Sequence, residues 1–195
     1  TTVTGESCTC NECGLSGGGL DGASRVALDW KCCTIAGNEA TGDGGGVAVY
    51  VSFNLSGGTI GGENKGNKGV EGGGVLFSGT DKVMDFYGGD IIYNEATNSG
   101  GGIYHASGTL KIRDNANISQ NKAKNGGGLM VAFSSKVEIS GGQITNNKAS
   151  NNGGGITSTI DTAIAVSGGV ISANTAASRG GGMYAMGNVT ISGGT

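Results

Sequence analysis

Residues 126–155 read GGGLMVAFSSKVEISGGQITNNKASNNGGG and contain every part of a repeat that runs through the chain. A glycine triplet is followed by one apolar residue, then by an apolar-x-apolar pair, a Ser-Gly-Gly corner and an Ile-x-x-Asn sequence. The triplet occurs seven times at intervals of 26 to 28 residues, which indicates a repeat architecture. The last glycines of the triplets are Gly19, Gly46, Gly74, Gly102, Gly128, Gly155 and Gly182.

Each unit holds three short segments in which apolar and polar residues alternate, separated by glycine or polar corners. Three short strands in a turn of about 27 residues are typical of a parallel β-helix, in which each coil pairs with the coils above and below it. We therefore predict an all-β, single-domain parallel β-helix solenoid over residues 1–195. It has an incomplete first coil at 1–16 and seven repeats over 17–195, the last of them incomplete.

The composition agrees with this fold and limits the partners. The chain has 43 glycines and no proline, as expected where nearly every backbone N–H is needed for a ladder hydrogen bond. A net charge of -3 argues against nucleic acid as a partner. The sequence has no apolar run of 18 residues, so we expect no insertion into a membrane.

Asparagines recur at one position of the repeat, where we predict a stacked ladder joined by side-chain amide bonds. The copy at Ile60 has one extra residue before its asparagine. The predicted ladder is Asn11, Asn38, Asn64, Asn94, Asn121, Asn147 and Asn174.

Charges on the outward positions support the same register. The residues after the ladder asparagines alternate in sign over the first four coils, and such neighbours stabilise a sheet modestly. In the middle strand Asp85, Lys111 and Glu138 alternate as well. The column after the ladder is Glu39, Lys65, Glu95, Lys122, Lys148 and Thr175.

In this register the chain enters and leaves the solenoid in the same strand. A solenoid end without a cap is an edge that invites pairing. We expect either the continuation of a longer β-helix or a homo-oligomer in which subunits stack head to tail.

The five cysteines lie in the first coil and a half. Their spacing matches no standard metal-ligand pattern, so one or two disulfides are the better interpretation, and these imply an oxidising, extracytoplasmic setting. The odd number leaves one thiol that could bond to another chain. The candidates are Cys8, Cys10, Cys13, Cys32 and Cys33.

No pattern in the sequence points to catalysis. The single histidine, His105, has no nucleophile or carboxylate in an obvious triad relation, so a structural or surface role is favoured. The acidic residues are scattered, and calcium-loop motifs are missing. We predict a non-enzyme with no catalytic, cofactor-binding or metal residues. A polysaccharide lyase or glycoside hydrolase remains the alternative.

One outward column is unusually apolar and allows two interpretations. It is either an exposed contact stripe or a surface covered by a neighbouring loop. Its members are Leu76, Tyr104, Met130 and Tyr184.

The units from Gly100-Gly-Gly-Ile-Tyr104 to Asn121-Lys-Ala123 and from Gly126 to Ala149 resemble the glycine-rich repeats of bacterial cell-surface and adhesin-like proteins with a right-handed, pectate-lyase-like β-helix. They are similar also to the repeats of chlamydial polymorphic outer-membrane proteins. The resemblance covers residues 17–195 and implies a right-handed helix and an exported setting.

We therefore expect a secreted or cell-surface structural rod that acts in adhesion or in head-to-tail assembly, with a host-surface or glycan ligand. A polysaccharide-binding or polysaccharide-cleaving β-helix is the alternative.

Overall fold

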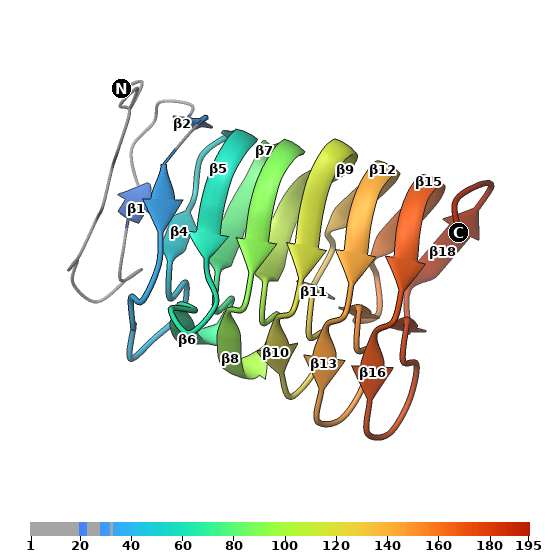
Figure 1. Ribbon diagram of the computed structural model, residues 1–195. Helices are drawn as coiled ribbons and strands as arrows, with labels where there is room; N and C mark the ends of the chain where they lie inside the picture. Colours follow the sequence, from blue (N-terminus) through green and yellow to red (C-terminus); the bar gives the residue numbers. More distant parts are fainter. Residues whose placement is uncertain (1–19, 23–27, 32) are drawn as a thin grey trace.

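The computed structural model describes residues 20–22, 28–31 and 33–195, and every regular element in these ranges is a β-strand. The chain winds into a parallel β-solenoid with about 27 residues per turn (Figure 1). One wall of the solenoid consists of seven parallel strands, and each strand is joined to the next by one turn of the chain, which makes six turns. These strands are β1 (Leu20–Gly22), β4 (Val47–Val49), β7 (Val75–Ile92), β9 (Ile103–Ser119), β11 (Leu129–Val131), β14 (Ile156–Ser158) and β17 (Met183–Ala185).

A second wall carries the middle of each coil. It pairs strands from successive turns in parallel and shares β7 and β9 with the first wall. The strands of this wall alone are β2 (Leu28–Trp30), β3 (Thr34–Ile35), β5 (Phe53–Gly61), β12 (Lys136–Thr145), β15 (Ala163–Ser172) and β18 (Asn188–Ile191).

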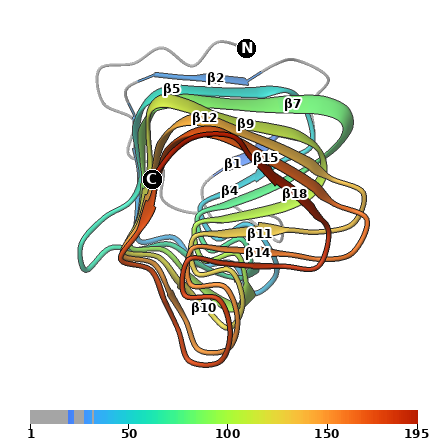
Figure 2. The ribbon, with the colours of Figure 1, turned by 90° about the vertical axis from the view of Figure 1, so that its right-hand side faces the viewer.

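A five-stranded sheet forms a lobe that projects from the body of the solenoid (Figure 2). Its strands are β6 (Lys68–Glu71), β8 (Glu95–Ser99), β10 (Lys122–Ala123), β13 (Lys148–Ala149) and β16 (Thr175–Ala176). In Figure 1 the near strands run down the page while the chain advances from left to right, and the view along the axis in Figure 2 agrees. This sense of rotation makes the solenoid right-handed.

The predicted parallel β-helix is confirmed, with one difference in its strands. The middle and third segments were expected to be separate, but β5, β12 and β15 each continue through the Ser-Gly-Gly corner. The second glycine of each corner has a positive φ, for example 75° at Gly142, and the pairing register shifts there. The corner therefore bends the strand as a bulge does, without ending its ladder.

The core consists of apolar columns that follow the solenoid axis. Residues in register on adjacent coils are apolar and almost fully buried, as at Ile35, Ile60 and Ile91. Each coil is too small to bury a core alone, so stacking supplies the hydrophobic stabilisation. Another column contains Phe53, Met84, Leu110, Val137 and Ile164.

The three glycines of the triplet are needed for different reasons, seen at Gly100–Gly102: one for its backbone conformation and two for close contacts. Gly100 has a φ of 68°, which disfavours other residues. A Cβ on Gly101 would lie 2.3 Å from the carbonyl oxygen of Lys122, in the facing wall of the lobe. A Cβ on Gly102 would lie 2.6 Å from the Gly128 carbonyl oxygen. The two walls of the lobe thus pack backbone to backbone, and only glycine fits between them.

The asparagine ladder runs beside the triplets. Asn121 shows its pattern: its Nδ2 donates to the Oδ1 of Asn147 at 3.1 Å and to the Ile91 carbonyl at 2.8 Å, and its Oδ1 accepts from Asn94. Each asparagine inside the ladder therefore bonds two other coils, and the terminal Asn38 and Asn174 bond one. The ladder comprises Asn38, Asn67, Asn94, Asn121, Asn147 and Asn174.

Asn64 is not a member of this ladder, so that prediction is wrong, and Asn11 lies outside the described residues. Asn67 takes the place, seven positions after Ile60 instead of three. The extra residues form an exposed turn, in which Asn64 has a φ of 59°. For the same reason Lys68, and not Lys65, pairs with Glu39 and Glu95. The other predicted outward columns pair as expected.

We predict that Asn121→Ala lowers the free energy of unfolding by about 2–4 kcal/mol, because it leaves several buried polar groups without partners. Asn64→Gly is the control, since it preserves the positive φ and should change stability by less than about 0.5 kcal/mol. Urea denaturation of both variants measures the difference. Equal losses would contradict the ladder assignment.

Gly102→Ala should destabilise the protein by about 1–3 kcal/mol, because its Cβ overpacks the next coil. The matched control is Gly182→Ala at the same repeat position, where the nearest atom to a new Cβ is 3.8 Å away. This control should be neutral or slightly stabilising, since alanine restricts the unfolded chain. Thermal denaturation compares the two, and a control as unstable as Gly102→Ala would refute the steric explanation.

Candidate functional site

The apolar stripe is covered at two of its four residues, so it does not form a continuous exposed contact surface. Leu76 and Met130 are buried, while Tyr104 and Tyr184 are partly buried, although the four lie in the predicted column. The first glycine of the triplet packs against this column: a Cβ on Gly126 would lie 3.1 Å from the Cα of Met130. Of the two interpretations, the structure thus favours coverage by the adjoining loop.

His105 lies in the core, so it has a structural position rather than a surface one. It pairs in register with Phe77 and Val131, and its ring stacks on Phe77 with centroids 5.3 Å apart. Its Nε2 lies 3.2 Å from the carbonyl oxygens of both Gly108 and Lys136. Burial lowers the pKa of His105 to about 4, so the ring is neutral near pH 7. No substrate could reach it without opening the core.

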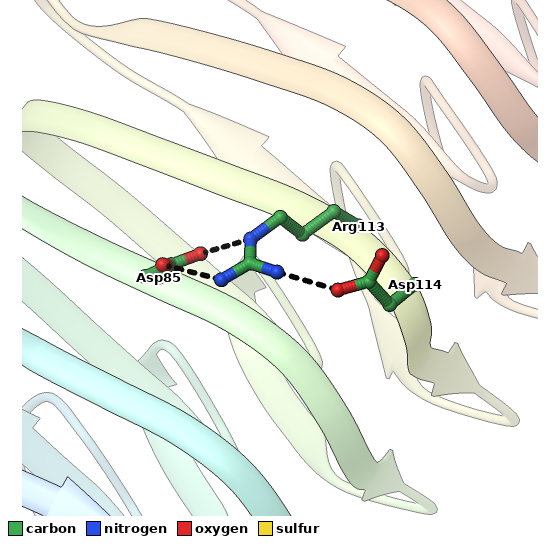
Figure 3. Close-up of polar contacts among 3 residues, drawn as sticks. All are labelled: Asp85, Arg113 and Asp114. Carbon is green, nitrogen blue, oxygen red and sulfur yellow. Dashed lines mark hydrogen bonds and ion pairs between the residues drawn. The ribbon is translucent and has the colours of Figure 1, made fainter.

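Within the described part of the chain, the largest ionic cluster lies on the face of β7 and β9 (Figure 3). Arg113 binds both carboxylate oxygens of Asp85, each at 2.9 Å, and also binds Asp114. Its guanidinium carbon lies 4.3 Å from the centre of the Tyr87 ring. These carboxylates raise the pKa of Arg113. Because both acids are paired with one guanidinium, neither is placed to act as a general acid.

Glu71 is a half-buried carboxyl group that sequence reasoning did not single out. Burial raises its pKa to about 7, while a hydrogen bond from Asn98 opposes the shift and Asp43 adds to it. Burial, with help from Glu71 and Asp43, raises the pKa of Tyr104 to about 12. The sequence did contain a sign of this interaction: Asp43 and Glu71 each directly precede a glycine triplet on adjacent coils, so the repeat places the two acids close together. Glu71 lines neither of the hollows described next.

The outer face of the lobe carries two shallow hollows of about 420 and 450 Å³ that share Glu95 and Thr97. The first contains three lysines and one acid, with small side chains beneath them. It is lined by Glu95, Ala96, Thr97, Lys122, Ala123, Lys124, Lys148 and Ser150. The second is lined by Glu39, Ala40, Thr41, Lys68, Gly69, Val70, Glu95 and Thr97. We take this face, which we call the lobe face, as the candidate binding site.

Within residues 20–22, 28–31 and 33–195, no three His, Cys, Asp or Glu side chains cluster in a way that could hold a metal ion. The same ranges contain no helix with the length and apolar character needed to cross a bilayer. Of the five cysteines only Cys33, which is buried, falls in the described part of the chain, so the disulfide prediction lies outside it.

The fold and the lobe face define the class of protein: a parallel β-solenoid with a charged lateral lobe. No protein-family model, no curated protein and no solved structure matches the chain.

We predict that His105 makes the protein less stable as the pH falls. Its pKa is about 6.5 when unfolded and about 4 when folded, so the unfolded state binds the proton first. The free energy of unfolding should fall between pH 6.5 and 4 by up to about 3 kcal/mol. His105→Phe, which keeps the stacking position, removes this contribution.

Glu71 acts in the opposite direction, since its pKa is higher in the folded state and its protonation favours folding as the pH falls from about 7. The measured quantity is therefore the difference in unfolding free energy between wild type and His105→Phe at several pH values. A difference that does not change between pH 6.5 and 4 would contradict the prediction.

Proposed function

We propose that this chain is a rod-like structural module of a secreted or cell-surface, adhesin-like protein. Its function is to hold a binding face in a fixed, repetitive array, and it needs no reaction centre for that. The observation that supports this most is the continuous bonding along the axis, in which the asparagine ladder joins six successive coils. Each bond crosses between coils, so the rod resists bending and separation of its rungs.

The expected exported setting rests on the resemblance of the repeats to bacterial cell-surface proteins and on the predicted disulfides. The pairing of three carboxyl groups with neighbouring side chains adds support for a role outside catalysis. Asp85 and Asp114 are held by Arg113, and Glu71 is hydrogen-bonded to Asn98.

Assembly along the axis is the second part of the proposal. At the β17–β18 end, an apolar hollow of about 260 Å³ includes Val166, Ile171, Met183 and Ile191. Ile191 is 68% exposed there, although it continues a column that is otherwise buried. Further coils or a second copy stacked head to tail would bury this surface.

Polysaccharide binding is the second candidate function. The hollow around Lys122 and Lys148 favours it, because cations, hydroxyl groups and small apolar side chains line one surface.

We predict that Ile191→Asp prevents head-to-tail assembly, because it places a charge in the surface that must be buried. Negative-stain electron microscopy of wild type should show rods joined end to end, and the variant should show single short rods. Phe133→Asp is the matched control, since Phe133 is 66% exposed on the side of the solenoid and its φ of 53° suits aspartate. Wild-type particles that remain single short rods would refute head-to-tail assembly, and particles that are not rods would refute the module itself.

A further inference from the structure

The charge on the lobe changes sign along the solenoid axis. The three coils that carry Asn38, Asn67 and Asn94 place four acids and one lysine in the lobe, namely Glu39, Asp43, Lys68, Glu71 and Glu95. The next three coils place four cations and no acid there, namely Lys122, Lys124, Lys148 and Arg179. These four side chains are exposed. We call them the basic patch.

The pair Lys122 and Lys148 departs from the charge pattern of its outward column, which is the column of residues that follow the ladder asparagines. Glu39, Lys68, Glu95 and Lys122 alternate in sign from coil to coil. Lys122 and Lys148 then lie directly opposite each other in β10 and β13. Like charges on adjacent strands destabilise a sheet. The fold does not need this pair, because a glutamate at position 148 would continue the alternation.

The surroundings of the pair are those of a sugar-binding surface. Ala96 and Ala123 lie buried at the floor of the hollow, while Thr97 and Ser150 give it hydroxyl groups and the exposed lysines add their aliphatic stems. Asn125 and Asn151 lie on the coils that carry Lys122 and Lys148, and the Nδ2 of Asn151 donates a hydrogen bond to the Oδ1 of Asn125 at 3.1 Å. A saccharide ring offers C–H faces and hydroxyl groups, and acidic saccharides add the negative charge that the lysines complement.

We propose that the basic patch and its hollow bind an acidic polysaccharide, a linear chain that carries carboxylate or sulfate groups. Lys122 and Lys148 contact the acidic groups, and the aliphatic stems of these lysines lie along the rings. Coils are about 4.8 Å apart, so the patch spans roughly 10 Å along the axis and holds a short stretch of the chain. This inference rests on the proposed function only in the extracellular setting that such a ligand presupposes.

A second copy of the protein is the competing occupant of the lobe. In parallel lobes, charges of the same sign would face each other, which disfavours association. In antiparallel lobes centred between Glu95 and Lys122, the acidic half of each copy would face the basic half of the other, but Lys148 would meet Lys68 and not an acid. A second copy therefore leaves one member of the Lys122–Lys148 pair facing a like charge, whereas an acidic polysaccharide complements both.

The test uses three polymers with one backbone: dextran, carboxymethyl-dextran and dextran sulfate. At low ionic strength the wild-type chain should bind one or both charged polymers in affinity electrophoresis and should not bind dextran. The two charged polymers separate carboxylate from sulfate recognition. Lys148→Glu should lower the affinity about tenfold. Lys82→Glu is the matched control, because Lys82 is exposed in β7, outside the lobe, and carries the same charge change.

A second readout separates binding from folding. Lys148→Glu should raise the denaturation midpoint, because it restores the alternation of charge while it removes binding. Equal loss of affinity in both variants, absence of binding to either charged polymer, or a lowered midpoint would overturn the proposal. Sedimentation velocity gives a further contradicting outcome: a wild-type dimer whose dissociation constant Lys148→Glu changes, in either direction, would assign the patch to a second copy. Electron microscopy of the variant shows whether the rod is intact, so failure of this site is distinguished from failure of the proposed module.

Discussion

The lobe depends on a direct contact between two stretches of backbone. The middle glycine of each triplet lies against the carbonyl groups of the facing wall, at distances that leave no space for a side chain, as Gly101 does against Lys122. Because the walls touch, the asparagine beside them is buried and must bond to its neighbours in the stack. The first glycine of the triplet lies close to the apolar column as well, as Gly126 does to Met130. The close packing of the lobe against the body therefore depends on the absence of Cβ atoms.

Much of the fold could be predicted because a solenoid converts sequence period directly into spatial neighbours. The apolar columns and the pairing of Asp85 with Lys111 needed only the repeat length. Asn67 was missed because the position was counted forward from Ile60, across an insertion. Counting back from the triplet would have found it, since Asn67 precedes Gly74 by seven residues and Asn121 precedes Gly128 by the same number.

The sites were harder to predict, because they depend on what covers a residue and not on its column. The alternation of apolar and polar residues along the strand shows that the side chain of Leu76 points away from the core. It does not show that Leu76 is buried, because that depends on residues in another part of the coil. His105 follows an outward residue and is inward by the same alternation, yet its two carbonyl contacts come from Gly108 and from Lys136, 31 positions away. Glu71 owes its raised pKa chiefly to burial, with a smaller contribution from Asp43 and an opposing hydrogen bond from Asn98, and these partners lie on adjacent coils, so no single repeat contains them.

The insertion after Ile60 has a consequence for how such a chain can change. The turn at residues 61–66 lengthens the connection between Ile60 and Asn67 at the junction of body and lobe, while both residues remain in their columns. Each coil contacts only its neighbours, so extra residues at this junction alter the surface without altering the stack. Equivalent junctions at Tyr93, Gln120, Asn146 and Ala173 already have the positive φ that starts a tight turn. They are natural acceptor positions for new loops, through which a rod of constant cross-section could acquire a different surface in each lineage or by grafting.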